Sequence, residues 1–558
     1  MTVGSSGRVS GEAVIAYHER TKHHFHGFAA SLGYLDWATQ PNPFRRYEGA
    51  ELVGLPLTAR GHPLLYRQLY GPVAAEPVTR ETVSLFLRYA LSITAWKQAG
   101  STRWALRANP SSGNLHPTEG YVLLPPLPGI GDAPALYHYA PRVHGLERRA
   151  TLARAVWTRQ APADPSTSFL AGLTSIHWRE AWKYGERAFR YCQHDAGHAL
   201  AALRIAAAAV GWGLVLVDGA THAAMAHLLG LDRDTDFGTA EREEPELLAL
   251  VGPGVASGDR PVLVDPVLGA DDAQWHGTAN VLSRHHVTDW AVIDEVAVAS
   301  RATGVTPPDA AAAGLPSAQD LVVAGAGRAE VTAEQVILGR RSAVDMDGAT
   351  ALPAVAFFQM LARLMPTADG RAMPWDAVSW RPRLHLALFV HRVEGLTPGL
   401  YALVRDRQRL DALRTAADGE FEWHRVDGAP AGLPLFLLAA GDYRDVAARV
   451  SCGQAIAADG AFSAGMIADY LDALVTEGPE AYRRLFWEAG AIGQVLYLEA
   501  EAAGARATGI GCFFDDPVHE TLGFTSREWQ SLYHFTVGGP VEDTRLSTLP
   551  AYESNPDA

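Results

Sequence analysis

The sequence predicts an α+β protein in which two related units follow one another in one chain. Residues 189–219 and residues 485–516 each read as an alanine-rich helix, then a Gly-x-Gly turn, then a short apolar strand. Upstream of each helix, residues 114–149 and 381–410 share a pattern of strand, turn and strand. Laying Gly197-His198 over Gly493-Gln494 brings the two helices into register. The same signals repeated in the same order indicate a duplicated unit, and the helices, apolar most of the way round, are expected to be buried.

The composition is that of an ordinary globular protein. The chain has 558 residues, of which 48% are hydrophobic and 20% charged, a balance that argues against disorder. Its 47 basic and 62 acidic residues give a net charge of −15, so the surface repels phosphate backbones and anionic membranes. We therefore expect no nucleic-acid partner.

We expect neither a secretory signal nor a membrane-spanning helix. Residues 1–20 lack a basic start followed by an apolar core and a cleavage site. The most apolar stretch, residues 199–217, contains an arginine and two glycines, whereas a spanning helix needs about 20 uninterrupted apolar residues. This stretch is predicted to be a buried helix that runs into a strand, and the protein is expected to be cytoplasmic.

Cysteine and histidine usage predicts no metal site. The three cysteines, Cys192, Cys452 and Cys512, are too few and too scattered for a disulfide framework or a CxxC site. Cys452 and Cys512 are interpreted as small core residues. Residues 21–26 contain three histidines, but no second ligand group follows at a suitable spacing.

The best linker candidate lies at residues 301–325, where Pro-Pro, glycine and an alanine run replace the periodic apolar pattern. This divides the chain into a first domain at 76–300 and a second domain at 326–558. Residues 1–75 precede the first domain and are predicted to be an accessory segment.

Basic residues in the second domain suggest a phosphate site. Arg340, Arg341 and Ser342 combine two guanidinium groups with a hydroxyl, and arginine offers paired donors that suit a phosphate dianion. Arg545 is a further candidate near the C-terminus. Each signal is weak alone, because arginine pairs are usually solvated.

The loop from Pro110 to Asn114 carries small polar groups next to exposed backbone. Ser111, Ser112 and Asn114 present donors and acceptors, and Gly113 permits a tight turn. This suits a heteroaromatic ring, although an ordinary loop that leads into a hairpin has the same composition.

Two Gly-x-Gly turns could bring backbone N–H groups close to a flat ligand. They are Gly509-Ile510-Gly511 and its counterpart at residues 211–213. Such turns are common without a ligand. Neither has the third glycine and the distal acidic residue of a dinucleotide fingerprint, so a Rossmann fold is disfavoured.

As a set, these motifs resemble the flavin-dependent nitroreductases, and in particular the SagB/ThcOx-type dehydrogenases, which include oxidases of thiazoline and oxazoline peptides. The most telling stretches are residues 108–122 and 182–198, and the resemblance covers about residues 75–290 and 330–548. It implies two fused nitroreductase-like domains that form an intramolecular pseudo-dimer, with a mixed or antiparallel sheet flanked by helices.

The resemblance also implies an FMN cofactor between the two domains, with the phosphate on the Arg-x-Ser of one and the ring beside the Pro-Ser-Ser-x-Asn loop of the other. The second domain has the arginines but reads Ser-Trp-Arg-Pro at residues 379–382, where the serine loop would lie. The first domain has the loop but no Arg-Arg-Ser before it. One complete composite site is therefore expected per chain, with its mirror site lost.

Lys183 and Tyr184 match the Lys-Tyr pair that azoline oxidases of this family use for proton handling. Arg187 and Arg190 follow on the same helical face and could lower the pKa of Lys183, or be solvated. A surface lysine beside an inward tyrosine is the alternative. Asp195 and His198 lie one helical turn apart and form either an acid–base pair or a structural hydrogen-bonded feature.

The resemblance implies an FMN-dependent dehydrogenase or oxidase that acts on a C–N or azoline-like bond of a peptide or small organic substrate. The alternatives are an NAD(P)H-dependent nitroreductase or ene-reductase, and a non-catalytic flavin- or peptide-binding partner in a biosynthetic complex. A partner enzyme of the same pathway is possible. As a pseudo-dimer the chain is expected to be a monomer, with a homodimer as the alternative.

Overall fold

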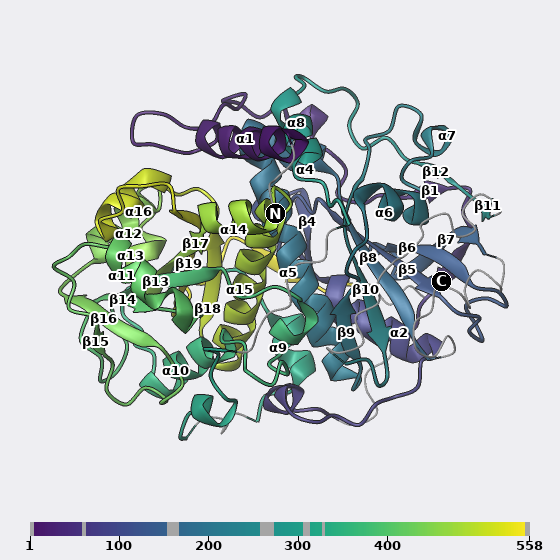
Figure 1. The fold of residues 1–558 in the computed structure, drawn as a ribbon. Coiled ribbons are helices and arrows are strands. Elements are labelled where there is room, and N and C mark those ends of the chain that lie inside the picture. Colours follow the sequence, from purple (N-terminus) through teal and green to yellow (C-terminus); the bar gives the residue numbers. More distant parts are fainter. Residues whose placement is uncertain are drawn as a thin grey trace.

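In this computed structural model, two sheets lie side by side with two long helices between them (Figure 1). The helices are α5 (Ala188–Ala209) and α15 (Ala481–Ala502), one from each predicted unit. The structure describes residues 5–57, 63–152, 167–256, 273–304, 313–325 and 330–552, with side chains from residue 10 onward.

The first sheet pairs its described strands in the order β11-β7-β6-β5-β8-β10-β9, with β2 also on β7, and every pair is antiparallel. The apolar runs of β5, β6 and β8 are buried along their whole length, as expected of strands covered on both faces. The strands span Leu52–Gly54 (β2), Thr118–Leu124 (β5), Ala135–Ala140 (β6), Gly145–Thr151 (β7), Phe169–Ser175 (β8), Gly213–Leu216 (β9), Glu244–Gly252 (β10) and Gln274–Trp275 (β11).

The second sheet repeats this plan in the order β15-β16-β14-β13-β17-β19-β18, again antiparallel. The strand before α5 or α15 and the strand after it occupy the same places in both sheets. The predicted internal repeat and the α+β class are confirmed. The strands span Leu384–Val390 (β13), Gly399–Leu403 (β14), His424–Arg425 (β15), Leu435–Ala440 (β16), Phe462–Asp469 (β17), Arg506–Ile510 (β18) and Trp529–Gly538 (β19).

The two central helices touch through small residues. A Cβ on Gly197 would lie 2.2 Å from the carbonyl oxygen of Trp487, and a Cβ on Gly490 would lie 2.1 Å from that of His194. The two contacts are reciprocal, so Gly197 and Gly490 are equivalent under an approximate twofold axis. The sequence-based alignment of Gly197 with Gly493 is therefore wrong by three residues, because Gly197 corresponds to Gly490.

The two Gly-x-Gly turns are not equivalent. Gly213 begins β9, whereas Gly509 lies near the end of β18 and Gly511 follows it. They therefore lie at opposite ends of corresponding strands, and their similarity in sequence does not reflect a shared role.

Of the remaining helices, α2 and α4 pack against α5, α10 and α14 pack against α15, and α6 and α16 pack on β10 and β19. Within the described residues, none of the helices has the length and apolar character that a bilayer crossing requires. Their spans are Ser5–Arg20 (α1), Arg80–Leu91 (α2), His177–Tyr184 (α4), His222–Leu229 (α6), Asp234–Phe237 (α7), Ala291–Ala299 (α8), Ala333–Gly339 (α9), Ala354–Arg363 (α10), Leu410–Ala416 (α11), Arg444–Val450 (α12), Ile456–Asp459 (α13), Tyr470–Glu477 (α14) and Asp515–Leu522 (α16).

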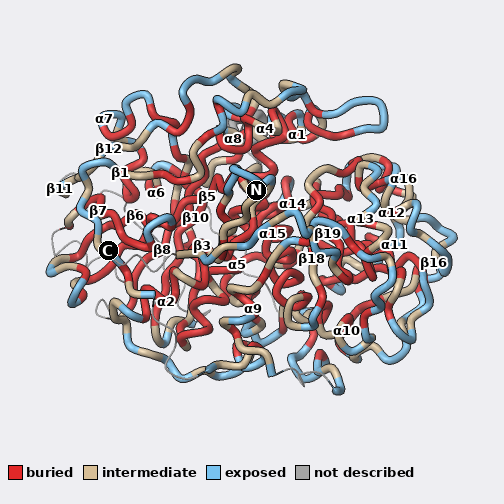
Figure 2. The backbone as a smooth tube through the Cα atoms, turned by 180° about the vertical axis from the view of Figure 1, so that it is seen from behind, coloured by how far each residue is buried: buried red, intermediate tan, exposed pale blue. Residues whose placement is uncertain are grey.

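Burial follows the same plan. The buried backbone, red in Figure 2, runs through the sheets and the central helices, while exposed segments form the rim. The first sheet and α5 share one core, and the second sheet and α15 share another. A smaller core lies on the other face of the second sheet, under α12 and α16.

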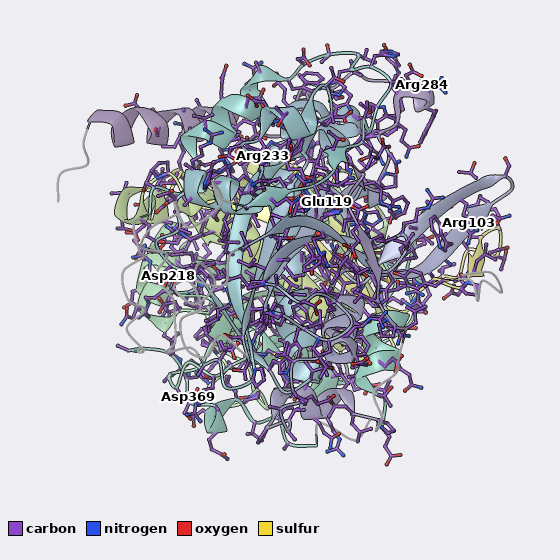
Figure 3. The ribbon with its side chains drawn as sticks, turned by 90° about the vertical axis from the view of Figure 1, so that its right-hand side faces the viewer. Arg103, Glu119, Asp218, Arg233, Arg284 and Asp369 are labelled. Carbon is purple, nitrogen blue, oxygen red and sulfur yellow. The ribbon has the colours of Figure 1, made fainter. Side chains whose placement is uncertain are left out.

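Both chain ends cross to the opposite unit. In α1, His18 contacts the Tyr482 hydroxyl at 3.2 Å and the Gln530 side-chain oxygen at 3.3 Å, both in the second unit. At the other end, β20 (Ser547–Leu549) pairs with β3 (Ile93–Ala99) of the first unit. Figure 3 shows the hairpin of β3 and β4 (Thr102–Arg107), labelled at Arg103, projecting from the body with the yellow C-terminal segment beside it.

A buried ion cluster joins the N-terminal segment to both units. Asp515 accepts bonds from Arg187 at 3.0 Å, Arg190 at 2.8 Å and the backbone N–H of His23 at 2.9 Å. Although burial raises the pKa of Asp515, the two arginines hold it well below its usual range. The arginines are thus neither solvated nor directed at Lys183.

The segments predicted to flank the domains are partly integrated into them. Within residues 1–75, β2 joins the first sheet, and β1 (Tyr47–Glu48) pairs with β12 (Thr278–Ala279). Of the predicted linker, residues 305–312 lie outside the described residues, as do residues 326–329 at the start of the predicted second domain.

Candidate active site

A cavity of about 450 Å³ lies between the two units and receives residues from both. The first unit contributes the loop before β5 together with the end of α4 and α5, and the second contributes the segment after α9 together with α15 and β18. Its lining includes these predicted site residues: Pro110, Ser111, Ser112, Asn114, Tyr184, Arg340, Arg341, Ser342, Gly509, Ile510 and Gly511.

Arg340 is buried in the wall with unused donors. Its Nη2 donates to the carbonyl oxygen of Arg107 at 2.9 Å, and its guanidinium lies over the Tyr497 ring at 4.9 Å. In the described part of the chain, its Nε and Nη1 have no hydrogen-bond partner. Burial lowers the pKa of Arg340. A buried guanidinium with free donors is the environment that an anionic group completes.

Arg341 and Ser342 continue this end of the cavity. Arg341 Nη1 donates to the carbonyl oxygens of Leu338 at 2.9 Å and Arg340 at 2.7 Å. Burial, and then the charge of Arg340, lowers the pKa of Arg341 to about 10. The Ser342 hydroxyl lies 2.9 Å from that of Tyr497.

The structure places Arg545 outside this lining. Its guanidinium binds Asp543 at 2.8 Å, and its side chain is 86% exposed. Arg506, which sequence analysis missed, lines the cavity from β18. No motif marks Arg506, and only the pairing of β18 with β19 places it there.

The serine loop is held by a buried carboxyl group. Asp195 in α5 accepts bonds from the Ser112 backbone N–H at 3.0 Å and the Ser112 hydroxyl at 3.0 Å. Ser111 Oγ accepts from the His116 N–H at 2.7 Å, and Asn114 Nδ2 donates to the Ala105 carbonyl at 2.8 Å. These bonds fix the loop so that its polar groups border the cavity.

Tyr184 and Lys183 pack directly on this loop. A Cβ on Gly113 would lie 2.5 Å from the Tyr184 hydroxyl and 3.1 Å from Lys183 Nζ, and Gly113 has a φ of +55°. Only glycine fits both the space and the conformation. Lys183 is half-buried and adjoins the lining, while Tyr184 is part of it. Burial raises the pKa of Tyr184.

A second carboxyl group, not found by sequence analysis, lies behind the loop. Burial, and then the charge of Asp195, raises the pKa of Glu180 well above its usual range. Burial raises the pKa of Asp195 to about 7. Glu180 stands three residues before Lys183 in α4, which is the signal that could have indicated it. The pair can hold a proton close to Lys183 and Tyr184.

Two glycines at the end of β18, Gly509 and Gly511, leave space for tyrosine rings in the cavity wall. A Cβ on Gly509 would lie 1.9 Å from the Tyr533 hydroxyl, and a Cβ on Gly511 would lie 2.3 Å from the Tyr191 ring. The Gly509 N–H donates to the Tyr497 hydroxyl at 3.0 Å. Glycine here thus brings three phenol rings to the cavity.

Asp195 and His198 bond to different partners and do not form an acid–base pair with each other. His198 Nε2 lies 3.2 Å from the Tyr533 hydroxyl, whereas Asp195 binds Ser112. Burial, and then Arg340, lowers the pKa of His198 to about 3, so its ring stays neutral.

Cys452 and Cys512 are not core residues, which corrects their interpretation from sequence. Both are half-buried, and their sulfur atoms lie 2.7 Å apart. His23 Nδ1 lies 3.7 Å from Cys512 Sγ, so three possible metal ligands that are distant in sequence come together. Cys192, by contrast, is fully buried.

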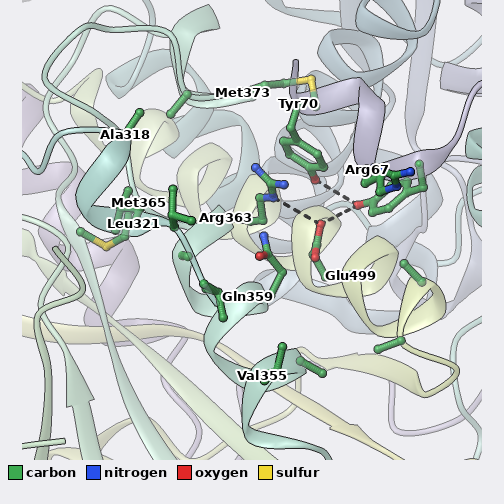
Figure 4. Close-up of a pocket in the computed structure, with 18 of the residues that line it drawn as sticks. Arg67, Tyr70, Ala318, Leu321, Val355, Gln359, Arg363, Met365, Met373 and Glu499 are labelled. Carbon is green, nitrogen blue, oxygen red and sulfur yellow. Dashed lines mark hydrogen bonds and ion pairs between the residues drawn. The ribbon is translucent and has the colours of Figure 1, made fainter. Parts of the chain in front are cut away.

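A larger open pocket of about 990 Å³ lies elsewhere, beside α10 and the end of α15 (Figure 4). The main polar groups of this pocket contact other residues of its lining. Glu499 accepts a hydrogen bond from the Tyr66 hydroxyl at 2.9 Å, and the Arg363 guanidinium lies over the Tyr70 ring at 3.6 Å. None of the predicted site residues lines it. The cavity between the units is therefore the candidate active site.

The family model described as "Nitroreductase family" matches residues 72–240 and 411–539, one match in each unit. No curated protein matches the chain. A solved structure from Anabaena variabilis, provisionally assigned as a nitroreductase, is 23% identical, with a TM-score of 0.67 over 95% of this chain and 99% of its own. Two fused domains of this fold are thus confirmed.

Two further solved structures cover a smaller share of the chain. One is a provisionally assigned nitroreductase from Ralstonia eutropha, 16% identical, with a TM-score of 0.26 over 38% of this chain and 99% of its own. The other comes from the E. coli microcin synthetase McbBCD complex with truncated pro-MccB17, 17% identical, with a TM-score of 0.27 over 44% and 94%.

Proposed function

Because this chain belongs to the nitroreductase family, we propose that it is an FMN-dependent oxidoreductase with one flavin site, built from both units. The observation that carries the proposal is the buried Arg340, whose free Nε and Nη1 donors line a cavity that the serine loop of the other unit also lines. The cavity volume of about 450 Å³ lies within the usual range for ligand sites.

The residues present fit the cofactor. Arg340, Arg341 and Ser342, with Arg506 beside them, would hold the phosphate. Ser111, Ser112 and Asn114 on one side, and the Gly509–Gly511 backbone on the other, would flank the ring. Bound FMN supplies two-electron chemistry, and the protein supplies placement and proton transfer.

Within this class we propose a SagB-type dehydrogenase that oxidises a C–N or azoline-like bond in a peptide or small organic substrate, working in the cytoplasm. Support comes from the Lys183–Tyr184 pair, which packs against the serine loop with Asp195 and Glu180 behind it. Lys183 would take the substrate proton, and Tyr184 would orient the reacting group. An NAD(P)H-dependent reductase and a non-catalytic binding partner remain the alternatives to be tested.

The first test is flavin stoichiometry. Purified protein refolded with excess FMN should retain about one flavin per chain as a monomer, measured by absorbance and light scattering. Two flavins per chain, or none, would contradict the composite site.

The second test separates the reactions. The flavin-loaded protein is mixed anaerobically with NADPH, NADH or azoline-containing peptides, and flavin absorbance is followed. Bleaching by a peptide, slowed in Lys183→Ala, supports the dehydrogenase. Rapid bleaching by NADPH that is unaffected in Lys183→Ala would favour the reductase, and no bleaching by any donor would favour a binding protein.

A further inference from the structure

Two cysteines from distant parts of the second unit meet at the edge of the cavity. Cys452 follows the end of α12, and Cys512 follows β18. Their sulfur atoms lie 2.7 Å apart, and Cys512 lines the cavity. Both are free thiols and partly exposed, unlike the fully buried Cys192. The pair is therefore within reach of small reagents in the cavity.

The surroundings make the two thiols unequal. His23 Nδ1 lies 3.7 Å from Cys512 Sγ, where the ring can favour the thiolate form of Cys512. Cys512 is part of the cavity lining, whereas Cys452 lies behind it against the Cys512 sulfur. A cysteine that borders a cavity with a second thiol directly behind it is the arrangement of an attacking and a resolving cysteine.

The backbone at Cys452 is also unusual. Its φ is +56°, in the left-handed region that residues other than glycine rarely adopt. This conformation turns the chain directly after α12 and helps place the Cys452 sulfur against Cys512. Such outliers concentrate where function depends on them.

We propose that Cys452 and Cys512 form a reversible redox pair that reacts with low-molecular-weight disulfides. The Cys512 thiolate attacks one sulfur of the disulfide, which breaks the S–S bond, releases one thiolate and leaves a mixed disulfide on Cys512. Cys452 loses its proton and attacks Cys512 Sγ, which forms the Cys452–Cys512 bond and releases the second thiol. The protein dithiol loses two electrons and the small disulfide gains them, and no flavin is required.

To test this, the full chain, with any flavin that it retains, is incubated with oxidised glutathione. The products are then identified by intact-protein mass and by peptide mass spectrometry. We expect a loss of two hydrogens and a peptide crosslink between Cys452 and Cys512, reversed by reduced dithiothreitol. Cys452→Ser should accumulate a glutathione adduct on Cys512, and Cys512→Ser should react at least tenfold more slowly. Cys192→Ser, the matched control, should behave as wild type.

Several results would overturn the proposal. They are the absence of the crosslink in wild type, an equal rate in Cys512→Ser, and an adduct on Cys452 in preference to Cys512. One zinc ion per chain after purification without chelator, lost in both His23→Ala and Cys512→Ser, would instead make this cluster a metal site. Because the readout is protein mass, it does not depend on flavin chemistry, and failure of the flavin proposal leaves it unaffected.

Discussion

The two interfaces related by the approximate twofold axis differ in what fills them. The first encloses the cavity of about 450 Å³, whereas the second, around Ser379, Trp380 and Trp487, leaves about 80 Å³. The Trp380 and Trp487 rings lie 6.3 Å apart in the space that corresponds to the cavity. Trp487 stands at the position equivalent to His194.

The framework under the two interfaces is nevertheless the same. Asp195 holds the serine loop through Ser112, and its equivalent Glu488 holds the corresponding loop through the Arg383 N–H at 3.0 Å. The carboxyl anchor is thus common to both units, and the side chains above it decide whether a ligand fits. In a fused chain, a substitution can alter one interface and leave the other unchanged. In a dimer of identical subunits, the same substitution would appear in both interfaces.

The sharpest contrast should appear in turnover. Lys183→Ala should lower turnover by about 10²–10⁴-fold with FMN retained, because a proton-transfer group contributes that much. Tyr184→Phe should lose less. The control is Thr476→Val at the equivalent position, which should turn over as wild type. The rate of flavin reduction is measured by stopped-flow absorbance. Equal rates for Lys183→Ala and Thr476→Val would show that the two interfaces do not differ in catalysis.

Opening the second interface should cost stability without creating a site. Trp487→Ala should lower the free energy of unfolding by about 3–5 kcal/mol, because a large buried side chain is removed. Flavin content should stay at about one per chain. Urea unfolding measures the stability, and flavin absorbance measures the flavin content. A second bound flavin would show that Trp487 alone keeps flavin out of the second interface.

Removing a phosphate donor should weaken flavin binding. Arg340→Ala should lower FMN affinity by about ten- to a hundredfold, the effect of about 1.5–3 kcal/mol for a charge-assisted bond. Ser342→Ala and Asn114→Ala should have smaller effects. Arg484→Ala at the second interface is the control and should bind FMN as wild type. FMN affinity is measured by fluorescence titration. If Arg340→Ala and wild type bound FMN equally well, Arg340 would not belong to the flavin site.

The raised pKa of Asp195 predicts a pH effect on stability. The folded protein keeps this proton up to about pH 7, whereas the unfolded chain loses it near pH 4, so stability falls as pH rises between these values. The slope is at most about 1.4 kcal/mol per pH unit. Asp195→Asn should flatten it in urea unfolding between pH 4.5 and 7. An unchanged slope would assign the effect to other groups such as Glu180.

Much of the fold was predictable because it depends on local pattern. The duplicated helix and strand signals predicted two units, and the resemblance to the nitroreductases indicated the serine loop and Arg340 as parts of one site. The three-residue error in pairing the central helices arose because alanine-rich sequences align in several registers. Only the glycine contacts, which bring the two backbones together, select the correct one.

The site was less predictable where it depends on tertiary contact. Trp380 and Trp487 are far apart in sequence, and neither indicates that it fills an interface. Cys452 and Cys512 carry no spacing signal, because a turn and a strand end bring them together. Arg545 shows the opposite error, since a basic residue in the right region binds its neighbour Asp543 instead.

The crossed chain ends make the covalent connection between the units partly redundant. The N-terminal segment holds the second unit through His18 and Asp515, and the C-terminal strand holds the first through β3. If the chain were cut between the units, each fragment would still carry a terminal segment that binds the other fragment. The connection would then serve mainly to keep their mutual concentration high, and the two fragments would recognise each other as partners.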